Sequence, residues 1–204
     1  YHDRDNDGLF ETSAGEDAIS GVTVQLRNEG GQVIDTTQTD GSGHYEFNRL
    51  LPATYSLLEV HPNQWIDGKD TLGSVASWNA SLSKGDVTND TFRSIALLSG
   101  DVGTNYNFGE RLGSLAGRVH ASNDQDCVQD ADELGLQGVL IMLVDQDGRN
   151  WTTTTDASGD YMFDGLWAGV YTVIEEQPAG YFNGGQVAGT GGGDASAANR
   201  IADV

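Results

Sequence analysis

The sequence predicts an all-β protein made of two tandem antiparallel β-sandwiches, and three observations carry this prediction. Apolar and polar residues alternate over short segments, as at Val22, Val24 and Leu26, which is the pattern of a strand with one buried face. Glycine-rich or Asp-Gly turns such as Asp147-Gly148 separate these segments. No long segment keeps the apolar period of about 3.6 residues that an amphipathic helix requires.

An internal repeat accounts for the two tandem copies. The segment that starts at Gly21 (GVTVQLRNEGG) matches the one that starts at Gly138 (GVLIMLVDQDG), and a set of residues recurs 116 positions later. The set is Asp40, Gly43, Tyr45, Phe47, Leu50, Tyr55, Glu59 and Pro62, which return as Asp156, Gly159, Tyr161, Phe163, Leu166, Tyr171, Glu175 and Pro178. We therefore predict two domains, residues 1–111 and 112–204. A single large barrel is the alternative, and it does not account for the duplication.

Each domain is expected to contain the same strands in the same order. In the first domain the alternating segments lie around residues 22–26, 45–47 and 55–57, and a long polar connection over 67–101 precedes a closing strand at 106–108. The second domain begins with a further strand, GSLAGRVH, for which only Tyr1 and His2 correspond in the first. We expect the first domain to lack this N-terminal strand and the second to be cut short at Val204.

Composition excludes several classes of function. The chain has 204 residues with Asp+Glu 31, Lys+Arg 10 and a formal net charge of -21, so it offers no basic cluster for nucleic acid or for an anionic membrane surface. Its longest apolar run, Val139 to Val144, is far shorter than the roughly 20 residues of a membrane span. A single cysteine, Cys127, excludes an intrachain disulfide framework and a cysteine zinc cluster.

Each domain opens with a segment dense in oxygen ligands. Calcium loops of the EF-hand type place ligands at alternating positions, with a backbone carbonyl at position 7, a closing Glu at 12 and glycine at 6. The first loop offers Asp3, Asp5, Asp7, the carbonyl of Leu9, Glu11 and, after two inserted residues, Glu16. The second loop offers Ser122, Asp124, Asp126, the carbonyl of Val128, Asp130 and Glu133. These residues are the predicted Ca²⁺ ligands.

The second loop departs from this pattern at two positions. Cys127 stands where glycine is expected, and Ser122 replaces the first carboxylate, so we expect the second site to be weaker or more distorted. The alternative for both loops is an acidic solvated turn. Strand patterns flank the second loop, at Leu115 to Val119 and Val139 to Leu143, so an ion that rigidifies is expected here instead of one that switches two helices.

The ordered series of motifs resembles the B-type repeat of serine-aspartate-repeat surface proteins, a relative of the collagen-adhesin B-type domain. The series is an acidic loop followed by GEDAISGVTVQL, TDGSGHYEFNRLLPATYSLLEV, DGKDTLGS and GTNYNFGE. The resemblance implies a prealbumin-like or immunoglobulin-like sandwich in a secreted or surface-attached bacterial protein, where such repeats form a calcium-stiffened stalk. Neighbouring repeats of the same chain would then be its partners.

The resemblance also implies more than one calcium ion per repeat. By position, Asp40 and Asp156, and less directly Asp67 and Asp70, are candidates for the extra ligands. Each of these residues has an alternative role as an ordinary turn aspartate.

Nothing in the sequence favours an enzyme. His2, His44, His61 and His120 lie in unrelated contexts, and no pair of them has zinc-ligand spacing. No nucleophile elbow or phosphate-cradling glycine motif is present, and the paired carboxylates lack an apolar substrate cleft in the sequence pattern. The leading prediction is a non-catalytic, calcium-binding structural repeat with a role in adhesion.

The alternative is a binding module that holds an extracellular protein or glycan through exposed aromatic residues. Trp65, Trp78, Trp151 and Trp167 are the candidates, and Trp78 is the best of them because it lies in the Gly- and Ser-rich connection. Trp167 follows the Leu166 strand pattern, which is more typical of core or edge packing.

Overall fold

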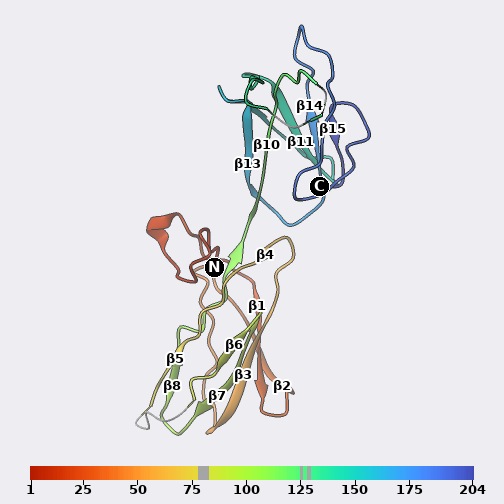
Figure 1. The fold of residues 1–204 in the computed structure, drawn as a ribbon. Coiled ribbons are helices and arrows are strands. Elements are labelled where there is room, and N and C mark those ends of the chain that lie inside the picture. Colours follow the sequence, from red (N-terminus) through yellow and green to blue (C-terminus); the bar gives the residue numbers. More distant parts are fainter. Residues whose placement is uncertain (78–82, 125, 128–129) are drawn as a thin grey trace. The chain divides into compact units, whose positions relative to one another are not determined.

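A computed structural model describes residues 1–77, 83–124, 126–127 and 130–204 of the chain. The chain forms two compact units, Tyr1–Leu112 and Gly113–Val204 (Figure 1). The described residues contain strands and one short 3-10 helix, and no helix among them is long and apolar enough to cross a membrane. The predicted all-β class and the antiparallel pairing of its strands are confirmed.

The first unit holds the 3-10 helix and nine strands. They are η1 (Thr12–Ala14), β1 (Thr23–Asn28), β2 (Val33–Gln38), β3 (Ala53–Val60), β4 (Ile66–Asp67), β5 (Ser74–Ala76), β6 (Asp86–Thr88), β7 (Thr91–Leu97), β8 (Val102–Thr104) and β9 (Glu110–Arg111). Its main sheet is antiparallel in the order β2-β1-β3-β7-β6, and the short pairs β5-β8 and β4-β9 form separate ladders. Figure 1 shows this sheet with β2 at one edge and β6 toward the other.

Alternation along β1 and β3 builds the core of the first unit. Val24 and Leu26 of β1 lie on the same buried face as Tyr55 and Leu57 of β3, because successive side chains of a strand point to opposite faces. Phe92, Ile95, Tyr106 and Phe108 pack against this face and complete the cluster. The closing segment at 106–108, expected as a strand, forms only an isolated bridge between Asn107 and Thr71, but it contributes two aromatic rings to the core.

The second unit repeats this plan in shorter form. Its strands are β10 (Gly113–Arg118), β11 (Leu140–Asp145), β12 (Asn150–Thr154), β13 (Asp160–Leu166), β14 (Tyr171–Glu175) and β15 (Arg200–Ile201). The main sheet has the order β12-β11-β14-β15, and β10 pairs with β13 in a second layer. The core is formed by Val139, Ile141, Leu143, Phe163, Leu166, Tyr171 and Val173.

The structure differs from the sequence expectation at two further places. The expected strand at 45–47 takes part in no ladder among the described residues, whereas the corresponding β13 is paired along its length with β10. The expected long connection over 67–101 contains three strands, β5, β6 and β7, of which β7 is central to the main sheet. Its apolar residues Phe92 and Ile95 are buried, and this burial stabilises a strand that its polar neighbours obscure in the sequence.

Candidate metal centres

The first acidic loop folds its carboxylates toward one another. Asp3 is fully buried, and its carboxylate accepts hydrogen bonds from the backbone N–H groups of Asp7 (3.1 Å) and Gly8 (2.9 Å). Ligand atoms of Asp3, Asp5 and Glu16 lie within 4.8 Å of one another, and so do those of Asp5, Asp7 and Glu11. The structure therefore brings five of the six predicted residues of this loop into two overlapping groups that share Asp5.

The two inserted residues are accommodated by the helix η1 without loss of the closing glutamate. Gly15 ends the helix in the left-handed conformation (φ 80°), and the chain then returns Glu16 to the loop. Glu16 is buried, and its two carboxylate oxygens accept hydrogen bonds from the backbone N–H groups of Arg4 (3.0 Å) and Glu11 (2.7 Å). The sixth predicted ligand is the backbone carbonyl of Leu9. The Leu9 side chain is exposed, and the Leu9 backbone N–H donates a hydrogen bond to Asp7 Oδ1 (2.7 Å).

The second acidic loop closes in the same way. Glu133 is buried and accepts hydrogen bonds from the N–H groups of Asn123 (2.5 Å) and Asp130 (3.3 Å), as Glu16 does from the corresponding residues of the first loop. The Asn123 N–H bond holds the pKa of Glu133 below its ordinary value. Cys127 adopts a left-handed φ of 63°, the conformation that explains why glycine is preferred at this position. Val128 lies outside the described residues.

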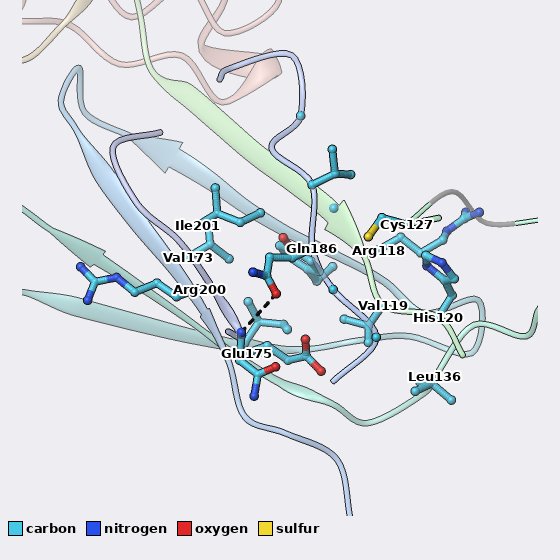
Figure 2. Close-up of a pocket in the computed structure, with 18 of the residues that line it drawn as sticks. Arg118, Val119, His120, Cys127, Leu136, Val173, Glu175, Gln186, Arg200 and Ile201 are labelled. Carbon is cyan, nitrogen blue, oxygen red and sulfur yellow. Dashed lines mark hydrogen bonds between the residues drawn. The ribbon is translucent and has the colours of Figure 1, made fainter. Parts of the chain in front are cut away.

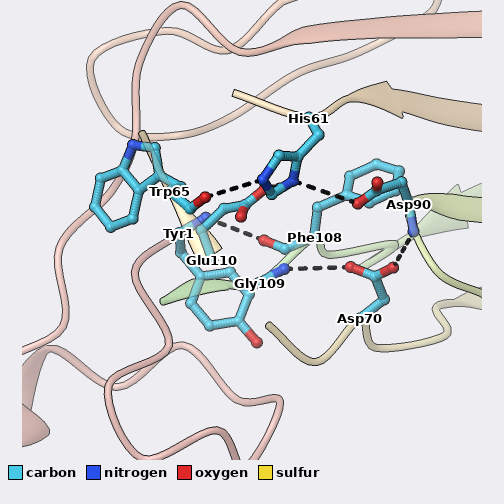
Figure 3. Close-up of polar contacts among 8 residues, drawn as sticks. All are labelled: Tyr1, His61, Trp65, Asp70, Asp90, Phe108, Gly109 and Glu110. Carbon is cyan, nitrogen blue, oxygen red and sulfur yellow. Dashed lines mark hydrogen bonds and ion pairs between the residues drawn. The ribbon is translucent and has the colours of Figure 1, made fainter. Parts of the chain in front are cut away.

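A second set of carboxylates gathers where β3, β4, β9 and the turn before β7 meet, and we call it the buried carboxylate cluster. Figure 3 shows His61, Asp70, Asp90 and Glu110 around this point. Ligand atoms of His61, Asp90 and Glu110 lie within 4.8 Å of one another, close enough to bind the same metal ion. The members of the whole cluster are Glu59, His61, Asp67, Asp70, Asp90 and Glu110.

Five carboxylate oxygen atoms of this cluster are buried and have no hydrogen-bond partner. Glu110 is fully buried with both Oε1 and Oε2 unpartnered, and Glu59 Oε2, Asp67 Oδ1 and Asp90 Oδ1 are in the same state. His61 Nδ1 lies 3.4 Å from Glu110 Oε1 and 3.8 Å from Asp90 Oδ1, while its Nε2 is 3.1 Å from the Trp65 carbonyl oxygen (Figure 3). Buried polar atoms normally have hydrogen-bond partners, so a hydrogen-bond donor or a cation is expected beside these unpartnered oxygen atoms.

Burial and mutual repulsion raise the pKa values of these acids. Desolvation raises the pKa of Asp70 to about 7, although its carboxylate accepts hydrogen bonds from the N–H groups of Asp90 (2.8 Å) and Gly109 (3.4 Å). Burial, followed by the charge of Glu110, raises the pKa of Glu59, and burial likewise raises the pKa of Glu110. Two carboxylates ~4 Å apart repel by about 4 kcal/mol at an effective dielectric constant of ~20. A divalent cation would remove this repulsion.

The cluster combines predicted and unpredicted residues. Asp67 and Asp70 are the candidates that the resemblance supplies, whereas Glu59, His61, Asp90 and Glu110 are absent from the predicted set. One sequence signal marks Glu59, because it continues the inward alternation of Tyr55 and Leu57 along β3 and is therefore an acid on a buried face.

The other two extra candidates, Asp40 and Asp156, have the same local role in each unit. Asp40 Oδ1 accepts hydrogen bonds from the Ser42 N–H (2.8 Å) and the His44 N–H (3.0 Å). Asp156 Oδ1 accepts the corresponding bonds from Ser158 and Asp160. Both carboxylates thus cap a turn, and neither belongs to a group of metal-sharing residues among those that the structure describes.

In the second unit, amides stand at the positions of two acids of the buried carboxylate cluster. Glu175 corresponds to Glu59, but Asn183 and Gln186 stand at the positions of Asp67 and Asp70. Figure 2 shows Glu175 and Gln186 beside a cavity of about 990 Å³ with apolar walls from Val173 and Ile201. Burial raises the pKa of Glu175. Within the described part of this unit no three acidic, histidine or cysteine side chains share a metal-sized space.

The described tryptophan side chains are partly exposed, and two of them contact a neighbouring aromatic or histidine ring. Trp151 and Trp167 are 37% and 39% exposed, and the Trp151 ring meets the ring of the buried Tyr171 edge to face at 6.2 Å between centroids. Trp65 contacts the His2 ring at 5.3 Å. Trp78, the leading candidate for a ligand contact, lies outside the described residues.

Comparisons with known proteins agree with the repeat and with the resemblance in its motifs. The model of the SdrD B-like domain matches residues 1–109 and again residues 113–203. The chain is 36% identical over 182 residues to the serine-aspartate repeat-containing protein F of Staphylococcus epidermidis. The matched region covers 89% of this chain and 10% of that protein. The chain is 35% identical over 188 residues to the serine-aspartate repeat-containing protein D of Staphylococcus aureus (strain Newman), covering 89% and 13%.

The chain therefore spans about a tenth of the length of the curated relatives that it matches. Among solved structures, the Bacillus anthracis TIE protein aligns with a TM-score of 0.39 and 15% identity, over 80% of this chain and 26% of that one. The two consecutive matches to one domain model, which together cover nearly the whole sequence, show that this chain belongs to the SdrD B-like family and contains two copies of its domain.

Proposed function

We propose that the two units are calcium-binding structural repeats of an extracellular protein on a bacterial surface, where they act as a spacer and serve adhesion without catalysis. The observation that carries the proposal is the buried carboxylate cluster, whose fully buried Glu110 has two unpartnered oxygens facing other unpartnered acids. Hard oxygen ligands in this number suit Ca²⁺, which takes 6–8 of them.

Protonation of the acids, instead of a bound cation, is the competing explanation for the unpartnered oxygens of the cluster. Raised pKa values would allow some of its acids to remain protonated near neutral pH, and each acquired proton would relieve part of the repulsion. A proton shared between two carboxylates satisfies one oxygen of each, whereas Glu110, Glu59, Asp67 and Asp90 together present five unpartnered oxygens, so two shared protons still leave one of them without a partner. One divalent ion bonded to several of them accounts for the geometry more economically.

The positions of the two groups in the first unit favour a structural role. The first loop joins the N-terminal segment to β1, and the cluster joins β3, β4 and β9, so ions there would tie together segments that are distant in the sequence. The surface location and the adhesive role rest on the kinship with serine-aspartate repeat-containing proteins. No Cys pair is present to brace the fold in the way that disulfides brace many extracellular domains.

Thermal unfolding of the whole chain with and without calcium tests the proposal. Free ligand at 100 times its dissociation constant adds about 2.7 kcal/mol, which corresponds to roughly 10–20 °C in Tm for a domain of about 100 residues. Glu110→Gln should reduce this gain while leaving the calcium-free protein as stable as before or more stable, because it removes a buried charge. Glu46→Gln, at an exposed position of the same unit, is the matched control and should change neither value.

The proposal would be wrong if chelation left the Tm unchanged and if Asp5→Ala, Asp7→Ala and Glu110→Gln all behaved like the control. A gain produced equally by Mg²⁺, which prefers six-coordinate geometry and retains its water ligands, would contradict a site selective for calcium.

A second candidate function is ligand binding through exposed aromatic residues, which is favoured by the partly exposed Trp151 and Trp167. A glycan array or a pull-down with extracellular proteins would detect it. Saturable binding that is lost in Trp78→Ala or Trp151→Ala but kept in Glu110→Gln would support this candidate over a plain spacer.

A further inference from the structure

The buried carboxylate cluster contains a nitrogen ligand, and this separates it from the first acidic loop. Ligand atoms of His61, Asp90 and Glu110 form one group of potential metal ligands. The other two groups found among the described residues, both in the first acidic loop, consist of carboxylates alone. Calcium takes oxygen ligands, whereas an imidazole nitrogen suits zinc and other first-row transition metals. The two candidate centres of the first unit therefore differ in the kind of ion that they can hold.

A hydrogen bond on the far side of the ring fixes the orientation of His61. Its Nε2 lies 3.1 Å from the Trp65 carbonyl oxygen (Figure 3). A carbonyl oxygen can only accept a hydrogen bond, so Nε2 carries a proton and Nδ1 of the neutral ring presents a lone pair. Metal-binding histidines almost always donate their other ring N–H to a carbonyl, a carboxylate or water in this way. The Trp65 carbonyl thus orients His61 as a ligand.

The Nδ1 atom of His61 faces two acids. This atom is buried and has no hydrogen-bond partner, although it lies 3.4 Å from Glu110 Oε1 and 3.8 Å from Asp90 Oδ1. Both of these oxygens are also without a partner, and the Glu110 side chain is fully buried. Two ligands that each lie about 2.1 Å from a tetrahedral zinc ion are about 3.4 Å apart. The three unpartnered atoms therefore suit a single cation bound between them.

The backbone holds the ligands in place before any ion binds. Asp90 has a left-handed φ of 53° in the turn before β7, and its N–H donates to Asp70 Oδ2 (2.8 Å). The Asp90 carbonyl oxygen accepts a hydrogen bond from the Glu59 N–H (2.9 Å), which ties this turn to β3. Glu110 is held in β9 by its pairing with Asp67 of β4. An ion would thus meet a site that needs little rearrangement.

The geometry points to a second kind of ion at the buried carboxylate cluster: a divalent transition-metal ion, Zn²⁺ above all, competes with calcium there by binding His61 Nδ1 together with Asp90 and Glu110. This inference rests on the proposed function, because it takes the cluster to be a cation site, and it names the ion that the site selects. The unpartnered oxygens of Glu59 and Asp67 offer further ligands in the same cluster. The first acidic loop, which has oxygen ligands only, stays with calcium.

The second unit has a different residue at the position of the nitrogen ligand. Gln177 stands where the first unit has His61. Nearby, Gln186 Nε2 donates to two backbone carbonyl oxygens (2.6 and 2.8 Å), and Gln186 Oε1 accepts from the Asn199 N–H (3.3 Å). Amides supply their own hydrogen-bond donors and are not among the usual ligands of zinc. Zinc binding of this kind is therefore expected in the first unit and not at the corresponding position of the second.

Calorimetric titration of the metal-stripped chain with Zn²⁺ and, separately, with Ca²⁺ tests the inference in the variant His61→Gln. Glutamine already occupies this position in the second unit, so the variant should fold. It should bind zinc about tenfold more weakly or worse and keep its calcium affinity within about twofold, because calcium needs only the oxygens. His44→Gln, at an exposed position of the same unit, is the matched control and should change neither affinity. Cys127→Ser should also leave zinc binding unchanged, which would exclude the thiol as the ligand.

A spectroscopic measurement separates metal ligation from a structural role of His61. In proton–nitrogen correlation spectra of the histidine rings, zinc should shift the Nδ1 signal that is absent from His61→Gln, and calcium should shift it far less. The inference is overturned if zinc leaves this signal unchanged, or if zinc binds His61→Gln as tightly as the parent chain. If calcium still raises the Tm in that case, the proposed function stands and this inference alone fails. If neither ion raises the Tm, both fail.

Discussion

At the scale of single residues, the candidate metal centres depend on a few positions where charge or backbone conformation is constrained. Glu110 matters because a fully buried carboxylate without a hydrogen-bond partner destabilises the folded state unless a cation accompanies it. Gly8 matters because it combines a φ of 86° with close contact to the side chain of Thr71. Both features concern the loops and strand ends that hold the acids.

Gly8→Ala should destabilise the first unit more than Gly31→Ala does. Both positions have left-handed φ, which costs a non-glycine residue roughly 1–2 kcal/mol. A Cβ at residue 31 meets no atom within 4 Å, whereas one at residue 8 would lie 2.7 Å from Thr71 Oγ1. Denaturant unfolding of the two variants, compared with the parent chain, measures the difference. Equal losses would mean that the loop moves freely away from Thr71.

The pH dependence of the calcium-free protein should reveal the buried carboxylate cluster. Because the folded pKa values of Asp70, Glu59 and Glu110 are raised, these groups bind protons more tightly in the folded state than in the unfolded state. Their contribution to stability is therefore present at low pH and is lost as pH rises from about 4.5 through about 7 and beyond. The Tm of protein stripped of calcium on a chelating resin should fall between pH 5 and pH 8.

Saturating calcium should abolish or reverse this fall, since the ion favours the ionised acids. Glu110→Gln isolates the contribution of the cluster from carboxylates elsewhere, such as Asp160, whose pKa is lowered by Arg118. A calcium-free Tm that rises with pH to the same extent in the parent and in Glu110→Gln would contradict the assignment.

At the scale of elements, the 3-10 helix η1 explains how two loops of different length reach the same closed form. The chain makes a short turn at Thr12–Ala14 and returns Glu16 to the position that Glu133 occupies without any insertion. The hydrogen bonds that each glutamate accepts are the same in both units, so the inserted residues are spacers and not part of the site.

Deletion of Ser13 and Ala14 should therefore leave the calcium response of the first unit intact. The shortened loop has the spacing of the second one, in which Glu133 closes directly after Asp130 to Asp132. Deletion of Asp5 and Asn6 is the control, and it should remove the response because Asp5 belongs to both metal-sharing groups of the loop. Calorimetric titration with calcium distinguishes the two deletions. Loss of binding in both would show that the helix itself is required.

The elements also show what could be predicted from the sequence. Alternation and Asp-Gly turns identify β1, β3, β11, β13 and β14, and the alternating acids identify both loops, because these signals are local. The buried carboxylate cluster could not be found in this way, since Glu59, Asp90 and Glu110 come together only when β3 pairs with β7 and β4 pairs with β9.

At the scale of the whole molecule, the acids at the candidate ion sites are distributed unequally between the two units. The first unit has the acids Asp67 and Asp70 where the second has Asn183 and Gln186, and Asp3 and Gly8 where the second has Ser122 and Cys127. The formal net charge of -21 is in part a consequence of carboxylates gathered at potential ion sites.

Calcium should therefore stabilise the first unit more than the second. Differential scanning calorimetry should show two transitions, of which the one assigned to the first unit moves further on addition of calcium. Phe92→Ala provides the assignment, because Phe92 is fully buried in the first unit and its loss should cost about 3–5 kcal/mol there. Phe182→Ala, at a 97% exposed position, is the control. Equal shifts of both transitions would contradict the inequality of the sites.

The parallel pairing of the two ends of the first unit has a mechanical consequence. Tyr1–Asp3 lies beside Phe108–Glu110, and bonds from the Asp3 N–H to the Glu110 carbonyl (2.7 Å) and from the Glu110 N–H to the Tyr1 carbonyl (2.8 Å) join them. When tension is applied at Tyr1 and Leu112, parallel segments are pulled in opposite directions along their length. These bonds would then be sheared together instead of being unzipped one by one, so the unit should resist stretching with a high rupture force in single-molecule pulling.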